Sequence, residues 1–405
     1  MHILFIHNNF PAQYRHIAGA LALNPDHKIG FITQNKTDGD LPGVTKIVFE
    51  PTRKAHATTH LYVKQFENAV LEAQAVVRVL EQLKAKDFVP DLVCAHTGWG
   101  CGMFVKDIFP NTPLLLYCEW FTRFRNSDLD FDPTSPASLD DILRFRASNA
   151  AMLIDLEACD GGVTPTHWQH SRFPEVFQPR IQVLHDGVDT DYFQPQKNVK
   201  LRLPGLDLSD AQEIVTYVSR GIDTYRGFPQ FIEALAVLLI RRPHCHAVIV
   251  AADRIAYGSS PPEGKSWKDW MRAKVDLDWS RVHFTGSLPY KSYRQVLQAS
   301  SVHVYLTRPF VLSWSLLEAL STGCLVVASN TAPVREVIQD NVNGLLVDFF
   351  DTQAIANRIE DALNDRDQAS IQRQNARTTV LERYALAKLL PQHLKILGNY
   401  MQRGY

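Results

Sequence analysis

The segment EIVTYVSRGIDTYRGFPQFIEAL, residues 213–235, decides the fold of the second half of the chain. Its apolar run 214–218 ends in a Ser-Arg-Gly turn that contains Arg220, and a helix-like pattern begins near Phe228. That order predicts a strand, a glycine-containing loop and a helix. Arg220 and Arg226 would then lie between the carboxyl end of a strand and the start of a helix. Two guanidiniums there suit paired phosphate oxygens, so we expect a diphosphate ligand; an ion-paired surface is the alternative.

The first half of the chain also alternates between strand and helix patterns. Its opening residues 1–10 and the segment 28–34 are strand-like, with a helix-like stretch between them. Residues 62–86 carry apolar side chains with a period near 3.6, which predicts one long amphipathic helix. Short buried strands are expected at 92–95 and 114–117, and the polar segment 124–138 should be a long loop.

Strands and helices alternate again after a proline-containing stretch, 178–204, that we expect to be a linker. The further strand candidates are 248–251, 282–285, 302–306, 325–329 and 344–347. The predicted fold class is therefore α/β, with two Rossmann-like, doubly wound domains on either side of a cleft. In such open sheets ligands bind beyond the carboxyl ends of the strands.

A second informative segment, 309–351, contains Glu318 in the run Glu-Ala-Leu-Ser-Thr-Gly. Here the chain resembles retaining glycosyltransferases of the GT-B fold, in the large family four, group 1 type. In that family an arginine and a following basic residue hold the donor diphosphate, and the last glutamate of a Glu-x7-Glu motif binds the ribose. Residues 343–347 resemble the turn that follows this motif. Residues 185–195 resemble the segment between the domains, with His-Asp where Pro-Asn is usual.

The resemblance implies an acceptor-binding domain at 1–197, a nucleotide-sugar donor domain at 198–385, and a C-terminal helix at 386–405 that crosses back to the first domain. It implies transfer of a hexosyl group from a nucleoside-diphosphate sugar with retention and without a metal; this sugar is the co-substrate, and no cofactor is expected. Arg220 and Arg226 would neutralise the departing diphosphate. The leaving phosphate would take the proton of the acceptor. Polysaccharide or glycolipid biosynthesis is the expected setting.

Other donor contacts are expected around Glu318, whose carboxylate can accept from both ribose hydroxyls. An exposed helical glutamate is the alternative. If a helix begins just before it, the backbone N–H groups of Ser315, Leu316 and Leu317 could face the phosphates. His283 lies in a segment, 282–286, that resembles the strand lying against the nucleotide base.

In the first domain His96 and Glu119 each follow a predicted strand. Many family members place a histidine near the sugar where this chain has Glu119. Either residue could orient the acceptor or stabilise positive charge, and a purely structural role is the alternative. The loop after the first strand lacks the Gly-Gly pair of relatives, so Asn9 and Gln13 are expected to contact the donor with their side chains.

Phe310 marks the largest departure from the family pattern, because it stands eight positions before Glu318 where relatives have a glutamate. With a loop two residues longer, Arg308 would take that place instead. The sugar pocket should therefore be altered: either the donor sugar is apolar there, as in a deoxysugar, or Arg308, Ser313 and Ser315 supply the contact. The alternative is an inactive relative.

The composition is that of an ordinary globular protein. Its 405 residues carry a net charge of -1, which gives no reason to expect nucleic acid as a partner. The six cysteines show no zinc-type spacing, and thiols in a reducing compartment are expected. The first residues lack the pattern of a signal peptide, and no stretch is apolar enough to span a membrane. A cytoplasmic protein, peripheral at the inner face of the membrane at most, is expected.

Two other functions are compatible with this sequence. A sugar-nucleotide epimerase or hydrolase on the same fold would release an epimer or free sugar instead of glycosylating an added acceptor. A non-catalytic nucleotide-sugar sensor or scaffold of a polysaccharide pathway would bind the donor without turnover. Phe310 is the feature that favours the second of these. The sequence does not identify the base, the sugar or the acceptor.

Overall fold

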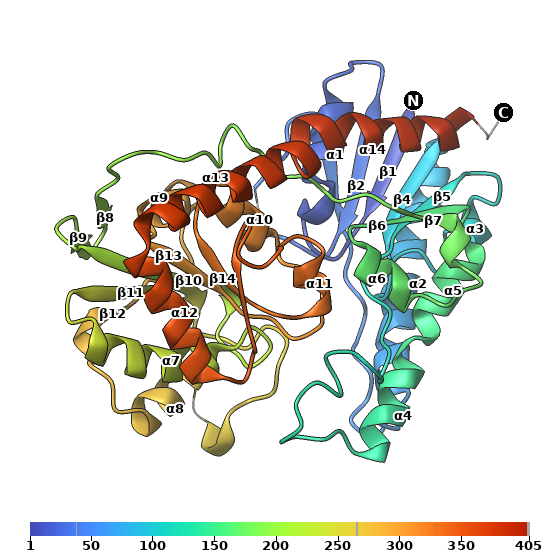
Figure 1. Ribbon diagram of the computed structural model, residues 1–405. Coiled ribbons are helices and arrows are strands. Elements are labelled where there is room, and N and C mark those ends of the chain that lie inside the picture. Colours follow the sequence, from blue (N-terminus) through green and yellow to red (C-terminus); the bar gives the residue numbers. More distant parts are fainter. Residues whose placement is uncertain (38, 265, 403–405) are drawn as a thin grey trace. The chain divides into compact units, whose positions relative to one another are not determined.

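The computed structural model describes residues 1–37, 39–264 and 266–402, and its contacts divide the chain into two compact units (Figure 1). The N-terminal unit comprises Met1–Asp186 together with Ala387–Tyr405, and the C-terminal unit comprises Gly187–Leu386. Each unit contains one parallel sheet with helices packed on it. The predicted fold class, with two Rossmann-like domains, is confirmed.

The N-terminal sheet has seven parallel strands in the order β3-β2-β1-β4-β5-β6-β7. These strands are β1 (His2–Ile6), β2 (Lys28–Thr33), β3 (Val44–Val48), β4 (Leu92–His96), β5 (Leu114–Tyr117), β6 (Gly161–Thr164) and β7 (Ile181–Val183). The helices of this unit are α1 (Arg15–Ala22), α2 (Lys64–Lys84), α3 (Val105–Ile108), α4 (Leu139–Ser148), α5 (Ala150–Ala158), α6 (His167–Arg172) and α14 (Leu386–Met401).

Strand β1 shows why this sheet is covered on both faces. Its side chains are buried in alternation: Ile3 and Phe5 pack in one cluster with residues of α1 and α14, while Leu4 and Ile6 pack in another with residues of α2 and α5. All four side chains are fully buried. A continuous apolar run is typical of a parallel strand buried on both faces.

The C-terminal sheet has six parallel strands in the order β12-β11-β10-β13-β14-β15, and a separate hairpin pairs β8 with β9. These strands are β8 (Leu201–Leu203), β9 (Leu206–Leu208), β10 (Glu213–Gly221), β11 (Cys245–Ala252), β12 (Val282–Phe284), β13 (Val302–Tyr305), β14 (Val326–Ser329) and β15 (Leu345–Val347). The helices are α7 (Phe228–Arg241), α8 (Trp267–Lys274), α9 (Tyr290–Ala299), α10 (Trp314–Ser321), α11 (Ala332–Arg335), α12 (Thr352–Asn364) and α13 (Arg366–Arg383). Within the described ranges, none of the helices is long and apolar enough to cross a membrane.

The units divide earlier than the expected boundary at 197/198, and the expected linker 178–204 is partly regular structure. Residues 181–183 form the edge strand β7, and residues from 187 onward already pack on the C-terminal unit. Phe193 is buried in the core of that unit. The Arg377 guanidinium donates to the carbonyl oxygens of Thr190 (2.9 Å) and Phe193 (2.7 Å). Pro195 and Pro204 therefore belong to the second unit, while Pro179 belongs to the first.

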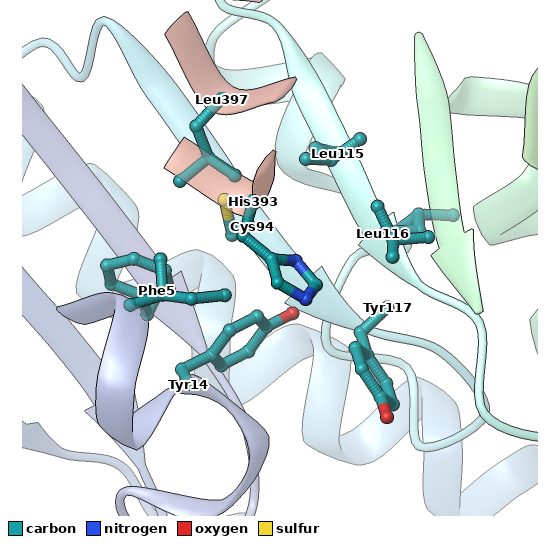
Figure 2. Close-up of a pocket in the computed structure, with 10 residues that line it drawn as sticks. Phe5, Tyr14, Cys94, Leu115, Leu116, Tyr117, His393 and Leu397 are labelled. Atoms are coloured by element: carbon teal, nitrogen blue, oxygen red, sulfur yellow. The ribbon is translucent and has the colours of Figure 1, made fainter. Parts of the chain in front are cut away.

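Helix α14 packs on the N-terminal sheet and brings the end of the chain into the first unit. Figure 2 shows Tyr14 and His393 beside a small cavity under this helix. Its volume, about 20 Å³, has room for one water molecule and is too small for a sugar. The helix approaches β6 closely at Gly161, where an added Cβ would lie 1.9 Å from the Tyr400 Oη.

A buried carboxylate on α5 anchors the loop that follows β4. Asp155 is fully buried, and its Oδ2 accepts a hydrogen bond from the Gly98 N–H at 3.3 Å. Burial raises the pKa of Asp155 to about 8. The loop held in this way carries Trp99, whose ring stacks on His96.

We predict that Gly161→Ala lowers the melting temperature, because the new methyl group would overlap Tyr400 and push α14 off the sheet. Overpacking of this kind costs roughly 1 to 3 kcal/mol. Gly398→Ala is the matched control, since nothing lies within 4 Å of an added Cβ there and alanine favours the helix. Thermal unfolding measures both variants, and equal melting temperatures would contradict the close packing at Gly161.

We also predict that Asp155→Asn gains stability relative to the unmodified protein as the pH rises from about 4 to about 8. Because burial raises the pKa of Asp155, the folded state binds a proton that the unfolded state has lost over this window. The carboxyl group therefore stabilises the fold at low pH and loses that contribution as the pH approaches 8. Denaturant unfolding at several pH values measures the difference. Glu157→Gln, at an exposed position of the same helix, is the control.

Candidate active site

Strand β10 and the loop after it place the two predicted arginines in different environments. Arg220 is the second-to-last residue of the strand and is exposed, whereas Arg226 lies in the loop and is only 6% exposed. Gly227 follows at a φ of +65° and starts α7. An added Cβ at Gly227 would lie 2.6 Å from the Cβ of Leu306, so only glycine allows the loop to pass so close to the end of β13.

The Arg226 guanidinium is held by neutral oxygen atoms. Its Nη1 donates to the Tyr305 hydroxyl (3.0 Å) and to the Thr307 Oγ1 (2.7 Å), and its Nη2 donates to the Val311 carbonyl oxygen (3.2 Å). A guanidinium has five N–H donors. The Nε–H and one Nη2–H therefore have no hydrogen-bond partner among the described residues, and no carboxylate in those ranges forms an ion pair with Arg226.

Arg226 remains charged in this buried position. Burial alone would lower the pKa of Arg226, but Tyr305, Tyr257 and Asp223 outweigh that effect and raise it. The guanidinium carbon also lies 5.5 Å from the ring centroid of Tyr257 and 5.9 Å from that of Tyr305. The loop thus presents a permanent, partly desolvated cation with free donors, which is a suitable site for an anion.

Glu318 is not an exposed helical residue, because it lies on the buried side of α10 and is 8% exposed. Its Oε2 accepts a hydrogen bond from the Tyr293 hydroxyl of α9 at 2.7 Å. Burial, and then the neighbouring Glu318 carboxylate, raise the pKa of Tyr293 well above its usual value, so this tyrosine stays protonated as the donor. The carboxylate is thus fixed in one orientation.

The start of α10 is capped by Ser313, whose Oγ accepts from the Ser315 N–H at 3.4 Å. The Ser313 carbonyl oxygen accepts from the Leu316 N–H at 3.2 Å. Leu316 and Leu317 have fully buried side chains in the core of the unit. The predicted helix therefore exists, but the N–H groups of Ser315 and Leu316 are directed to the cap. Their contact with phosphate stays a prediction.

Ser313 also links the helix to Arg226. The Ser313 N–H donates to the Tyr305 hydroxyl at 2.9 Å, and that hydroxyl accepts from Arg226 as well. One tyrosine oxygen therefore joins the loop after β10 to the first turn of α10. The structure brings Arg226, Ser313 and Glu318 into one neighbourhood of the C-terminal unit.

Phe310 and His283 have side chains that pack against other aromatic groups. The Phe310 ring makes edge-to-face contacts with Tyr225 (5.5 Å between centroids) and Tyr257 (5.3 Å). His283 on β12 hydrogen-bonds through its Nε2 to the Nδ1 of His246 at 3.1 Å, and the rings stack. Burial, and then His246, lower the pKa of His283. Contact of either residue with a donor stays a prediction.

In the N-terminal unit three predicted residues meet at the carboxyl ends of β4 and β5. The His96 Nε2 lies 3.3 Å from the Glu119 Oε2, and the Gln13 Nε2 donates to the Glu119 Oε1 at 2.9 Å. His96 is buried, while 32% of the Glu119 side chain is exposed. Asn9 differs from these residues, since it is exposed and its backbone N–H donates to the His7 Nδ1 at 2.8 Å.

The position of His96 is fixed by aromatic rings and by its own backbone. Its ring stacks on Trp99 (4.4 Å between centroids) and on Tyr117 (5.6 Å), and it meets His7 edge-on (4.6 Å). The His96 Nδ1 lies 2.7 Å from the Thr97 carbonyl oxygen, a contact that requires the proton on Nδ1. The Nε2 of the neutral ring is then an acceptor, and a proton on Nε2 would make the ring a cation beside Glu119.

The sequence analysis did not identify several residues that shape these sites: Tyr293, Tyr305, Thr307, Trp99 and His7. Tyr305 lies at the end of the predicted strand 302–306 and Thr307 directly follows that strand, so their place at a strand end is a usable signal. The contact of Tyr293 with Glu318 joins two helices, and nothing in the sequence indicates it. In the part of the chain that the structure describes, no group of three or more His, Cys, Asp or Glu side chains is arranged to hold a metal ion.

Two family models match the chain, one in each half. The model described as "Glycosyl transferase family 4 group" matches residues 25–193, and the model described as "Glycosyl transferases group 1" matches residues 204–379. The first range contains His96 and Glu119. The second contains Arg220, Arg226 and Glu318.

Curated relatives match about half of the chain. Alpha-maltose-1-phosphate synthase of Mycolicibacterium smegmatis is 27% identical over 55% of this chain and 58% of its own length. D-inositol 3-phosphate glycosyltransferase of Corynebacterium urealyticum is 27% identical over 53% and 47%, and alpha-D-kanosaminyltransferase of Streptomyces kanamyceticus is 28% identical over 48% and 47%. The chain thus spans about half the length of these relatives.

Solved structures share the fold over the whole chain. Sucrose-phosphate synthase from Thermosynechococcus elongatus superposes with a TM-score of 0.74 at 18% identity, and the match covers 100% of both chains. HepE from Anabaena, solved in complex with UDP-glucose, superposes with a TM-score of 0.69 at 18% identity over 98% of this chain and 100% of its own. With its family 4 and group 1 domains and this GT-B fold, the chain belongs to the group 1 glycosyltransferases.

Proposed function

We propose that the protein transfers a hexosyl group from a nucleoside-diphosphate sugar to a carbohydrate, lipid or small-molecule acceptor, with retention and without a metal ion. The observation that carries the proposal is Arg226, a buried guanidinium that, among the described residues, has two N–H donors without an acceptor and no carboxylate in an ion pair. A diphosphate would fill both donors and neutralise the charge. The structural neighbour HepE binds UDP-glucose, which supports a nucleotide-sugar donor.

In this proposal the C-terminal unit supplies electrostatic stabilisation. Negative charge grows on the diphosphate as the bond to the sugar breaks, and a fixed cation in a desolvated loop stabilises that charge. Arg226 would hold the diphosphate, with the exposed Arg220 as a second cation, and Glu318 would bind the ribose hydroxyls. The leaving phosphate would take the acceptor's proton. Two relatives are named for alpha-linked compounds, which supports retention.

The N-terminal unit would bind the acceptor through Glu119 and His96. Gln13 donates to the Glu119 Oε1 at 2.9 Å, which holds the carboxylate so that it could accept from an acceptor hydroxyl in a defined direction. We also propose a cytoplasmic location. All six cysteines are free thiols, which suits a reducing compartment.

We predict that Arg226→Ala weakens binding of a nucleoside diphosphate by roughly tenfold to a hundredfold, because charge-assisted contacts to phosphate are lost. Arg226→Lys should recover part of the affinity, since lysine keeps the positive charge but lacks the planar guanidinium that donates two parallel hydrogen bonds to a phosphate. Titration calorimetry with UDP, GDP and ADP measures the effect. Arg241→Ala, on the exposed side of α7, is the control. Unchanged nucleotide affinity in Arg226→Ala would contradict the diphosphate site. Loss of transfer on addition of EDTA would contradict the metal-free mechanism.

We predict that Glu318→Gln weakens binding of the ribonucleoside diphosphate by about tenfold and leaves the 2′-deoxy analogue much less affected. A carboxylate accepts more strongly from two ribose hydroxyls than an amide oxygen does. Both ligands are titrated into both proteins, so the analogue is an internal control for any general damage to the site. Equal losses for the two ligands would show that Glu318 does not read the ribose.

A further inference from the structure

Asp223 joins the two loops that lie beyond β10 and β11. It is fully buried, and each of its carboxylate oxygens accepts two backbone hydrogen bonds. The Oδ1 accepts from the N–H groups of Tyr225 (3.0 Å) and Arg226 (3.4 Å) in its own loop. The Oδ2 accepts from the N–H groups of Ala256 (2.9 Å) and Tyr257 (3.0 Å) in the other loop. One carboxylate therefore fixes the backbone of both loops.

Glycines allow these two loops to approach so closely. An added Cβ at Gly221 would lie 2.4 Å from the Arg254 carbonyl oxygen, and the same oxygen accepts from the Ile222 N–H at 2.9 Å. An added Cβ at Gly258 would lie 2.8 Å from the Thr224 Oγ1. Since Asp223 lies inside this tight junction, a change in its side chain should shift both loops together.

The side chains carried by the joined loops form one surface. The Tyr257 ring lies 5.5 Å from the Arg226 guanidinium and 6.3 Å from the Tyr225 ring, and it contacts Phe310 edge-on. Tyr257 is 37% exposed. The distance between an exposed ring and the buried cation is therefore set by the two loops that Asp223 holds.

The hydrogen bonds of Asp223 also decide what Arg226 can bind. With four N–H donors on its two oxygens, the carboxylate does not form an ion pair with the guanidinium, although its charge helps to keep Arg226 protonated. A direct ion pair would occupy the donors that a phosphate needs. The arrangement supplies a compensating negative charge and leaves the cation available.

We propose that Asp223 is the positioning residue of the diphosphate site: it clamps the loops after β10 and β11 so that Arg226 and Tyr257 face one ligand, without pairing with Arg226 itself. The inference rests on the proposed function, since it presumes that Arg226 binds the diphosphate. Asp223 itself touches no reacting atom. Its effect on binding acts through the position of Arg226.

The test is Asp223→Asn, which keeps the size of the side chain. The amide oxygen can serve one pair of N–H groups, but the amide nitrogen faces the other pair as donor against donor. We expect affinity for UDP, GDP or ADP, whichever the unmodified protein binds, to fall roughly tenfold or more by calorimetry. Combined with Arg226→Ala, the substitution should add nothing further, because its effect passes through Arg226. Losses that add would overturn the inference.

Two further variants separate positioning from general destabilisation. Thr216→Val on β10 removes buried hydrogen bonds to Ser300 (2.7 Å) and His303 (2.9 Å) and leaves the loops alone. It should lower the melting temperature and keep the nucleotide affinity. Gly221→Ala should force the loops apart, because its Cβ would lie 2.4 Å from the backbone oxygen of Arg254, and should weaken nucleotide binding even if Asp223→Asn does not fold.

Unchanged nucleotide affinity in Gly221→Ala, or in a folded Asp223→Asn, would overturn the role of Asp223. An affinity loss in Thr216→Val as large as that in Asp223→Asn would do the same. If the unmodified protein binds none of the three nucleotides, the proposed function fails instead. The two failures are therefore distinguishable within one set of titrations.

Discussion

A positive charge buried without a paired carboxylate is the constraint on which the C-terminal site depends. Removing a guanidinium from water costs several kcal/mol unless other groups replace its hydration. The Arg226 guanidinium donates to three neutral oxygen atoms and lies near two tyrosine rings. The negative charge of Asp223 also stabilises it, although that carboxylate is hydrogen-bonded to backbone N–H groups. These groups replace the hydration of the guanidinium only in part, because two of its N–H donors have no acceptor among the described residues. An anion bound in this loop would complete the stabilisation of the Arg226 charge, and the loop would need little reorganisation to bind it.

Tyr305 connects this cation to the helix that carries Glu318. Its hydroxyl is the shared acceptor of Arg226 and of the Ser313 N–H, so the start of α10 cannot move without moving the guanidinium. One turn further along the helix, Tyr293 fixes the Glu318 carboxylate. A ligand that spans phosphate and ribose would therefore meet groups whose spacing is set by one rigid helix. Such preorganisation lowers the entropy lost on binding.

The sequence predicted the layers well and the side-chain partners poorly. Runs such as 92–95 and 114–117 are apolar throughout, and a parallel strand buried on both faces requires that composition. The unit boundary was placed too late, because Phe193 packs on the second unit although prolines surround it. Nothing local distinguishes the exposed Arg220 from the buried Arg226. Their difference comes from Tyr305 and Val311, about eighty residues further on, and single-sequence patterns carry no information about such contacts.

The two units differ in the charged group that each leaves for a ligand, and this difference supports the proposed division of roles. In the C-terminal unit the Arg226 guanidinium keeps N–H donors that no described residue uses, while the nearby carboxylates are held by protein groups: Asp223 by four N–H groups and Glu318 by Tyr293. The N-terminal cluster centres on the partly exposed Glu119 carboxylate, whose Oε1 accepts from Gln13 and whose Oε2 lies near the His96 Nε2. A nucleoside diphosphate would be repelled by Glu119 and attracted to Arg226, while a neutral hydroxyl is a good partner for a fixed carboxylate. Under the proposed function, these groups would favour the donor diphosphate at Arg226 and an uncharged hydroxyl of the acceptor at Glu119.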